Sequence, residues 1–269
     1  MKKINVRKTD SFLHYYSQFK MIAESIYEWE NLPDSCNQKF LEKTLFYDGK
    51  ACFVKHPLND SIINLKCTPQ GQINIYDEPI AWRAYSYNFN EVYDEENIVI
   101  VHNNPIEKST ESIIIFYCEK IAEIEETINI NLACQKTPFI ILCDEKQRLT
   151  LKNLYEQYQG NAPVIYGNKN LTEILENFKV VSTNAPYLAD KLYEQKIKYI
   201  NELLNILGIE TNPSEQKKER LITDEVNANN EFSFFSNEMF LIYRQKATNE
   251  LNKKYGLNVV VKKREFEGV

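Results

Sequence analysis

Two long helical patterns lie on either side of a short compact segment, and this arrangement limits the fold more than any other feature of the sequence. Apolar residues recur at helical spacing from Ser109 to about Gln135, and again from Asn184 to Gly208, where a glycine ends the pattern. Because helices joined in this way run out from the body and back, we expect a helical hairpin with an α/β insert at its tip. Within the insert the expected elements are strand Phe139–Cys143, helix Leu149–Tyr158, strand Pro163–Tyr166, a helical turn at Leu171–Glu176 and strand Phe178–Val181.

The part before the hairpin reads as two helices followed by a β-rich region. Asp10 is a good N-cap for an amphipathic helix that continues to Trp29, and a second short helix is expected over residues 35–46. From Lys50 to His102, short apolar runs alternate with turn residues, which predicts a small barrel or a curled sheet. The expected strands are Ala51–Val54, Ser61–Cys67, Gln72–Tyr76, Ile80–Tyr87 and Asn97–His102.

The part after the hairpin begins with a polar segment. Residues 210–230 contain Pro213 and little hydrophobic periodicity, so we expect a loop there. An aromatic-rich stretch, a helix to about Tyr255 and a closing strand at Leu257–Lys262 follow. The chain is thus expected to consist of six segments: 1–107, 108–137, 138–182, 183–208, 209–230 and 231–269.

The motif content excludes several classes of enzyme. No two of the 7 glycines lie closer than seven positions, so neither GxGxxG nor GxxxxGK[ST] occurs. The three histidines lie more than forty residues apart and the six cysteines include no CxxC, which argues against zinc motifs and a disulfide framework. Cys118 or Cys134 could be paired with His102 as nucleophile and base, but an inert thiol is the default in apolar surroundings. We therefore expect no enzyme, no cofactor and no metal, with free thiols in a reducing cytoplasm.

Charge and hydropathy restrict the surroundings of the chain. The net charge of -6 argues against tight wrapping around nucleic acid, although it leaves room for a local basic patch. Every apolar run is far shorter than the roughly 20 residues of a membrane-spanning helix, so no membrane contact is expected.

Two sets of charged residues are candidates for contact with a polyanion. Lys191, Glu194, Lys198 and Glu202 fall on one face of the second long helix. The alternative for this face is an ordinary solvated surface with ion pairs between neighbouring turns. Lys217, Lys218 and Arg220 form the densest basic cluster, for which plain solvated surface is again the alternative.

Several blocks of the sequence resemble one family of phage proteins, in the same order over nearly the whole chain. That family is the head-tail connector, also called the portal or upper collar protein, of the small protein-primed podoviruses. The resembling blocks are IYEWENLP (26–33), FLEK (40–43), ACQKTPFII (133–141), LTLKNLYEQYQGNAPVIYG (149–167), NAPYLADKL (184–192), KKERLITDEV (217–226) and KKYGLNVVVK (253–262).

The resemblance implies an α+β, portal-type fold assembled as a dodecameric ring. In the family plan, residues 1–107 correspond to N-terminal helices and a wing with an SH3-like β-barrel, and residues 108–137 and 183–208 to stem helices. Residues 138–182 correspond to a small α/β clip, 209–230 to a channel loop and 231–269 to a C-terminal wing or crown segment. The resemblance also implies contact with DNA in the channel for Lys191, through the DKL motif, and for Lys217, Lys218 and Arg220; Lys198 extends the same helix face. A second lysine of the family is not matched in register, because Ser182 stands there and Lys179 lies three residues earlier.

The implied role is a channel through which double-stranded DNA is packaged, retained and ejected at one capsid vertex of a virion assembled in the host cytoplasm. The implied partners are the major capsid and scaffolding proteins, the packaging ATPase and the lower collar or tail proteins. The chain departs from the family in its short C-terminus and short basic arm. That arm, Lys2, Lys3, Arg7 and Lys8, is open to two interpretations, contact with a packaging RNA and a solvated terminus. Two other functions remain as alternatives, another phage collar or adaptor ring and a soluble hydrolase.

Overall fold

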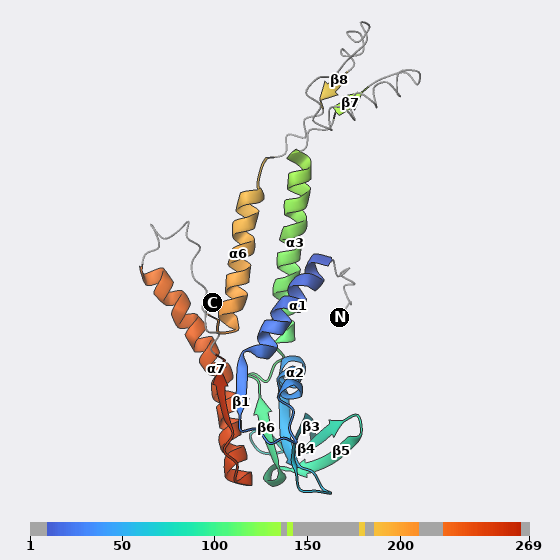
Figure 1. Cartoon of the computed structure of the whole chain (residues 1–269), viewed down its shortest axis with the longest axis vertical. Helices are drawn as coiled ribbons and strands as arrows, with labels where there is room; N and C mark the ends of the chain where they lie inside the picture. The colour runs from blue at the N-terminus through green and yellow to red at the C-terminus, as the bar shows by residue number, and fades with distance from the viewer. Residues whose placement is uncertain (1–9, 136–138, 142–177, 181–185, 210–222, 265–269) are drawn as a thin grey trace. The chain divides into compact units, whose positions relative to one another are not determined.

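The computed structural model describes residues 10–135, 139–141, 178–180, 186–209 and 223–264 (Figure 1). The chain divides into two compact units. The first, which we call the body, comprises Met1–Ile124 and Gln195–Val269, and the second comprises Glu125–Glu194. These boundaries fall inside the two long helices, whereas the sequence had suggested boundaries at their ends.

The β-rich region forms a five-stranded antiparallel sheet with the order β5-β4-β3-β2-β6. The short 3₁₀ helix η1 (Glu95–Asn97) links β5 to β6. The apolar residues inside the sheet pack on one another: Cys52, Val54, Leu65, Cys67, Trp82, Ala84 and Ile98 form a separate cluster. The sheet therefore has a core of its own, and the small barrel or curled sheet expected from the sequence stays a prediction. The strands are β2 (Lys50–Lys55), β3 (Ile62–Ile73), β4 (Pro79–Ser86), β5 (Phe89–Asp94) and β6 (Ile98–His102).

Two strand predictions were wrong in this sheet. The Pro69-Gln70-Gly71 sequence was expected to separate two strands, but β3 runs through it, with Pro69 opposite Trp82 and an irregularity between Gln70 and Ile73. Such an irregularity in the pairing allows a strand to contain a proline and a glycine and still continue. Strand β5 was missed because its sequence, FNEVYD, is mostly exposed and lacks an apolar run.

The first helix is shorter than predicted. Helix α1 (Asp10–Ser25) ends before Trp29, which lies in strand β1 (Tyr27–Glu30) and pairs with β9 (Val260–Lys263). In this segment Tyr27 and Trp29 are buried while Glu30 is exposed, which is the alternation of a strand. Both aromatic residues favour strands, and pairing with the C-terminal strand takes precedence over the helical spacing.

Helix α2 (Gln38–Asp48) begins three residues later than predicted and has defined caps at both ends. The Asn37 side chain accepts a hydrogen bond from Phe40 N at 2.9 Å. Gly49 ends the helix in the left-handed conformation, with φ of 74°. A Cβ there would lie 2.6 Å from the carbonyl oxygen of Glu107, so both the backbone and the space require glycine.

The two long helices are confirmed. Helix α3 (Glu111–Gln135) starts directly after Thr110, whose carbonyl accepts from Ile113 N and Ile114 N. Helix α6 (Ala189–Ile206) ends at Gly208, which has φ of 77°. There Ile209 N donates to Leu204 O and Gly208 N donates to Asn205 O, the hydrogen-bond pair of a Schellman motif.

The last helix corrects the expected loop. Helix α7 (Thr223–Tyr255) is continuous over 33 residues, so residues 223–230, which were expected to belong to the loop, are helical. The rest of the expected loop, residues 210–222, lies outside the described residues. The sequence Thr223-Asp224-Glu225 is typical of a helix start, because acidic residues in a first turn favour the helix dipole. The aromatic stretch after Glu231 belongs to the same helix.

Of the α/β insert, the described part is one antiparallel strand pair, β7 (Phe139–Ile141) with β8 (Phe178–Val180). The expected strands Phe139–Cys143 and Phe178–Val181 are confirmed over these residues. The helix, strand and turn expected between them lie outside the described residues.

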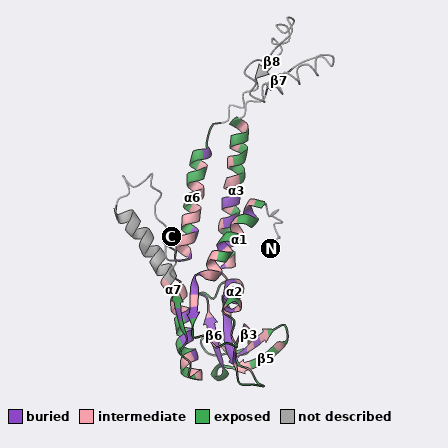
Figure 2. Ribbon diagram, in the orientation of Figure 1, coloured by how far each residue is buried: buried purple, intermediate pink, exposed green. Residues whose placement is uncertain are grey.

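The main core belongs to the body. It gathers fully buried side chains from α2, α3, α6 and α7, including Leu41, Ile121, Leu203 and Leu251 (Figure 2). Within the described ranges, the chain has no helix long and apolar enough to cross a membrane.

Candidate functional site

The predicted polyanion-binding residues of α6 lie on an exposed face. Lys191, Glu194, Lys198 and Glu202 are all exposed, while Leu203 on the same helix is fully buried. Neither lysine forms an ion pair with a described residue, so ordinary pairing between neighbouring turns does not account for the pattern. The face therefore presents alternating charges to its surroundings.

Contacts on the other sides of α6 set the direction of this face. In the second unit, Asn131 of α3 donates from Nδ2 to Pro186 O at 2.8 Å and accepts from Leu188 N at 2.9 Å. In the body, the ring of Tyr199 packs edge-on against Tyr117 of α3, with centroids 6.4 Å apart, and Lys120 Nζ lies 4.8 Å from the Tyr199 centroid. Burial and the nearby Glu202 carboxylate raise the pKa of Tyr117, so the Glu202 end of the charged face lies beside α3.

The remaining predicted residues lie outside the described part of the chain. They are Lys217, Lys218 and Arg220 of the basic cluster and Lys2, Lys3, Arg7 and Lys8 of the N-terminal arm. Of the predicted basic site residues, Lys191 and Lys198 are therefore the two that the structure describes.

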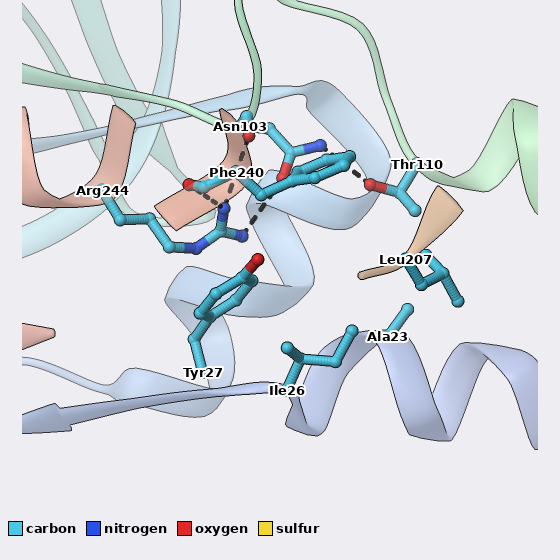
Figure 3. Close-up of a pocket in the computed structure, with 8 residues that line it drawn as sticks. All are labelled: Ala23, Ile26, Tyr27, Asn103, Thr110, Leu207, Phe240 and Arg244. Atoms are coloured by element: carbon cyan, nitrogen blue, oxygen red, sulfur yellow. Dashed lines mark hydrogen bonds between the residues drawn. The ribbon is translucent and has the colours of Figure 1, made fainter. Parts of the chain in front are cut away.

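A buried ion pair at the centre of the body escaped the sequence analysis. Arg244 of α7 donates to both carboxylate oxygens of Glu42 of α2, from Nε at 3.0 Å and from Nη2 at 2.8 Å. The same guanidinium donates to Asn103 Oδ1 at 3.1 Å and to the carbonyl of Phe240 at 3.2 Å, and it lies over the ring of Tyr27, 4.2 Å from the centroid (Figure 3). We call these residues, together with Trp29, the Arg244 network.

Further hydrogen bonds satisfy the acidic side of the Arg244 network. Trp29 Nε1 donates to Glu42 Oε1 at 2.8 Å, and Asn103 Nδ2 donates to Thr110 Oγ1 at 2.8 Å. Burial alone would lower the pKa of Arg244, but the Glu42 carboxylate has the opposite and larger effect. The pKa of Arg244 is therefore raised, and the guanidinium keeps its charge. The network thus connects α2, α7, β1 and the segment leading into α3.

The cavity beside this network is too small for a ligand. Its volume is about 20 Å³, roughly that of a single water molecule, and Ala23, Leu207 and Phe240 close its apolar side (Figure 3). Its position among four connected segments indicates a structural role.

The described cysteine and histidine side chains do not form the nucleophile and base considered above. Burial raises the pKa of Cys118 to about 12 and that of Cys36 to about 11, which disfavours the reactive thiolate. His102 lies 3.4 Å from Glu107 Oε1 and packs against the ring of Tyr243, and burial lowers its pKa. Among the described cysteines, Cys36, Cys52, Cys67 and Cys118 are free thiols. The described residues contain no group of three or more side chains that could hold a metal ion.

A pattern in the sequence could have revealed the Arg244 network. Glu42 lies one position after Leu41 and three before Leu45, on the buried side of α2. Arg244 lies three positions before Ala247 and seven before Leu251, on the buried side of α7. Opposite charges at core positions of two helices are compatible with folding only when they meet.

Comparison with known proteins identifies related families and folds. The family model described as Phage Connector (GP10) matches residues 1–266. A chain in the solved structure of the portal and tail of native bacteriophage P68 has 15% sequence identity to this chain and a TM-score of 0.55. The match covers 96% of this chain and 87% of that chain. The crystal structure of an HK97 family phage portal protein from Corynebacterium diphtheriae has 10% sequence identity to this chain, and the match covers 94% of this chain and 92% of that protein. Its TM-score of 0.41 is too low to support a shared fold. The predicted mixed helix and sheet fold of the portal type is confirmed by the first of these structures.

Proposed function

The chain belongs to the Phage Connector (GP10) family, and on this basis we propose that it forms the dodecameric ring through which double-stranded DNA is packaged, retained and ejected at one capsid vertex. The family match carries this proposal, because its range, residues 1–266, includes nearly the whole chain. A portal or connector role in a bacteriophage is thereby supported. A match of this length disfavours a soluble hydrolase, and it disfavours a different collar or adaptor ring.

The charged face of α6 has the composition that a DNA channel needs. Each phosphate that a lysine neutralises strengthens binding and increases its dependence on salt, so a dense basic wall would hold DNA too tightly for passage. Lys191 and Lys198 alternate with Glu194 and Glu202 along the exposed face. In a ring, each lysine would be repeated in every copy, giving sparse positive bands on a mixed wall.

The segment between α6 and α7 is the proposed channel loop. Lys217, Lys218 and Arg220 lie in it, together with Glu219. Individually weak contacts from these side chains would be quickly broken and remade, which allows movement of DNA yet can resist its backward slippage.

The role is structural, and the chemistry of packaging lies with other proteins. Membership of a structural family fits a chain that hydrolyses no ATP, so a separate packaging ATPase supplies the work. The proposed partners are the major capsid and scaffolding proteins around the ring and the lower collar or tail proteins below it. Attachment of the ATPase and the tail falls to residues 138–182, the proposed clip. Lys2, Lys3, Arg7 and Lys8 are the residues that would meet a packaging RNA, if one is used.

Replacement of the basic residues of the channel loop tests the proposal. We expect Lys217→Ala, Lys218→Ala and Arg220→Ala, combined in one chain, to leave ring assembly and DNA entry intact but to let packaged DNA leak from filled heads. A matched control changes Lys39 and Lys43, two exposed lysines of α2, to alanine. Retained DNA is measured as nuclease-protected genome per head over time; equal retention by the parent, the control and the triple variant would contradict the channel-loop assignment.

A further inference from the structure

An open groove of about 300 Å³ lies between the β-sheet of the body and the end of the last helix. Its volume falls at the lower end of the range for ligand pockets, about 300–1,000 Å³, whereas the cavity beside the Arg244 network has room for a single water molecule. We call it the Tyr255 groove. The residues that line it are Lys55 of β2, Val92, Tyr93 and Asp94 of β5, Asn97 of η1 and Tyr255 of α7.

The two tyrosines of the Tyr255 groove have their hydroxyl groups fixed by backbone carbonyls. Tyr93 Oη donates to Lys55 O at 3.2 Å, and Tyr255 Oη donates to Asn97 O at 3.2 Å. Burial raises the pKa of both tyrosines, so their hydroxyl groups stay protonated and these bonds persist. A hydroxyl oxygen that has donated its hydrogen can still accept, so each tyrosine supplies an aromatic ring and an acceptor.

The Asp94 carboxylate is only partly used within the body. Its Oδ1 accepts from Asn97 Nδ2, and none of the described residues donates to its Oδ2. Although Asp94 directly precedes η1, its side chain does not cap that helix. Because a carboxylate can accept about four hydrogen bonds, Asp94 retains most of its capacity for a ligand.

The nearby lysines are already engaged. Lys55 Nζ lies 3.6 Å from Asp60 Oδ1. Lys254 Nζ donates to the carbonyls of Glu95 and Ile98, at 3.1 and 2.7 Å. Since the tyrosine hydrogens are also in use, the Tyr255 groove mainly offers acceptors to a ligand.

Acceptor oxygens beside tyrosine rings suit a planar cation. A guanidinium carries only N–H donors, and its flat face stacks on aromatic rings. An ammonium would match the charge of Asp94 but has no flat face for the rings, and an anion would be repelled by the carboxylate. Val92 is 53% exposed, which gives the methylene groups of an arginine an apolar contact. The chemistry of the groove therefore matches an arginine side chain.

We propose that the Tyr255 groove binds an arginine side chain of a partner protein, with the guanidinium against the Tyr255 ring and hydrogen-bonded to Asp94 Oδ2. Charge complementarity supports this occupant, because residues 91–96 carry four exposed carboxylates. The inference goes beyond the proposed function, since every residue of the groove belongs to one chain. In a ring, the groove would be repeated in every copy and would offer the partner several points of attachment.

Binding of short peptides to the full chain tests the proposal. The probe is the blocked peptide acetyl-Ala-Ala-Arg-Ala-Ala-amide, and the control peptide carries citrulline, which keeps the shape of arginine without its charge. Saturation-transfer NMR detects weak ligands even on large assemblies and gives both dissociation constants. We expect the arginine peptide to bind at least about tenfold more tightly than the citrulline peptide. Equal binding, or no binding of the arginine peptide, would overturn the inference.

A charge-removing variant assigns the binding to Asp94. Asp94→Asn keeps an oxygen to which Asn97 can donate, and we expect it to weaken binding of the arginine peptide about tenfold. The matched control is Glu96→Gln, which removes a carboxylate from the same exposed segment but outside the groove. An equal loss in both variants would indicate general attraction to an acidic surface and would contradict the inference.

A second pair of variants tests the aromatic wall. Tyr255→Leu should weaken binding about threefold while the circular dichroism spectrum stays unchanged. Tyr87→Leu, at a 99% exposed tyrosine between β4 and β5, should have no effect. Equal binding by the two variants would contradict stacking on Tyr255.

Native mass spectrometry of the same samples separates this inference from the proposed function. Rings that do not bind the arginine peptide would overturn the inference and leave the proposed function standing. Monomers that bind the peptide with the expected specificity would support the inference and contradict the proposed function.

Discussion

The body and the second unit of this protein differ in where their apolar side chains are buried. Leu41 and Leu251 of the body are fully buried, and even its central charges, Arg244 and Glu42, are buried and paired. In the second unit, Ile130 of α3 is 64% exposed. Both units expose some large apolar side chains, but the main buried cluster of the described residues belongs to the body. Stability of the single chain should therefore depend mainly on residues of the body.

The largest expected effect comes from breaking the Arg244 network. Arg244→Ala leaves the Glu42 carboxylate buried without its partner, and we expect a loss of about 3–5 kcal/mol in the free energy of unfolding. The matched control is Lys262→Ala, which removes the exposed ion pair with Glu30 and should cost less than about 1 kcal/mol. Urea unfolding at low protein concentration measures both; nearly equal midpoints for the two variants would show that the Arg244 network does not hold the body together.

A smaller effect should separate two isoleucines of the same helix. Ile121 of α3 is fully buried in the body, and Ile130 of α3 is 64% exposed in the second unit. Ile121→Ala should lower the free energy of unfolding by about 2–5 kcal/mol because it leaves a cavity. Ile130→Ala should change it by no more than about 0.5 kcal/mol in the unassembled chain. If Ile130→Ala instead destabilised the isolated chain as strongly, Ile130 would belong to a packed core in the second unit and the contrast with the body would fail.

Much of this architecture could be predicted from local patterns. The helices α3 and α6 follow from apolar periodicity over many turns, and Gly208 marks the end of α6 because a left-handed residue is needed there. The exposed stripe with Lys191 and Lys198 follows from the same periodicity. Elements of this kind depend on residues that are close together in the sequence.

The errors arose where distant segments decide the structure. Trp29 fits a helical spacing, yet it lies in β1 because β9, more than two hundred residues later, pairs with it. The local pattern marks Glu42 and Arg244 as charges at core positions, but their pairing with each other depends on contact between α2 and α7, which are about two hundred residues apart. The helical start of α7 at Thr223 was hidden by a polar composition that also suits a loop.

Native mass spectrometry of the full chain at moderate salt tests the central claim most directly, because it counts the copies in the assembled particle. The family membership leads us to expect one dominant closed species, a dodecamer, that dissociates without a ladder of stable intermediates. A protein that stays monomeric at every concentration tested would contradict the account.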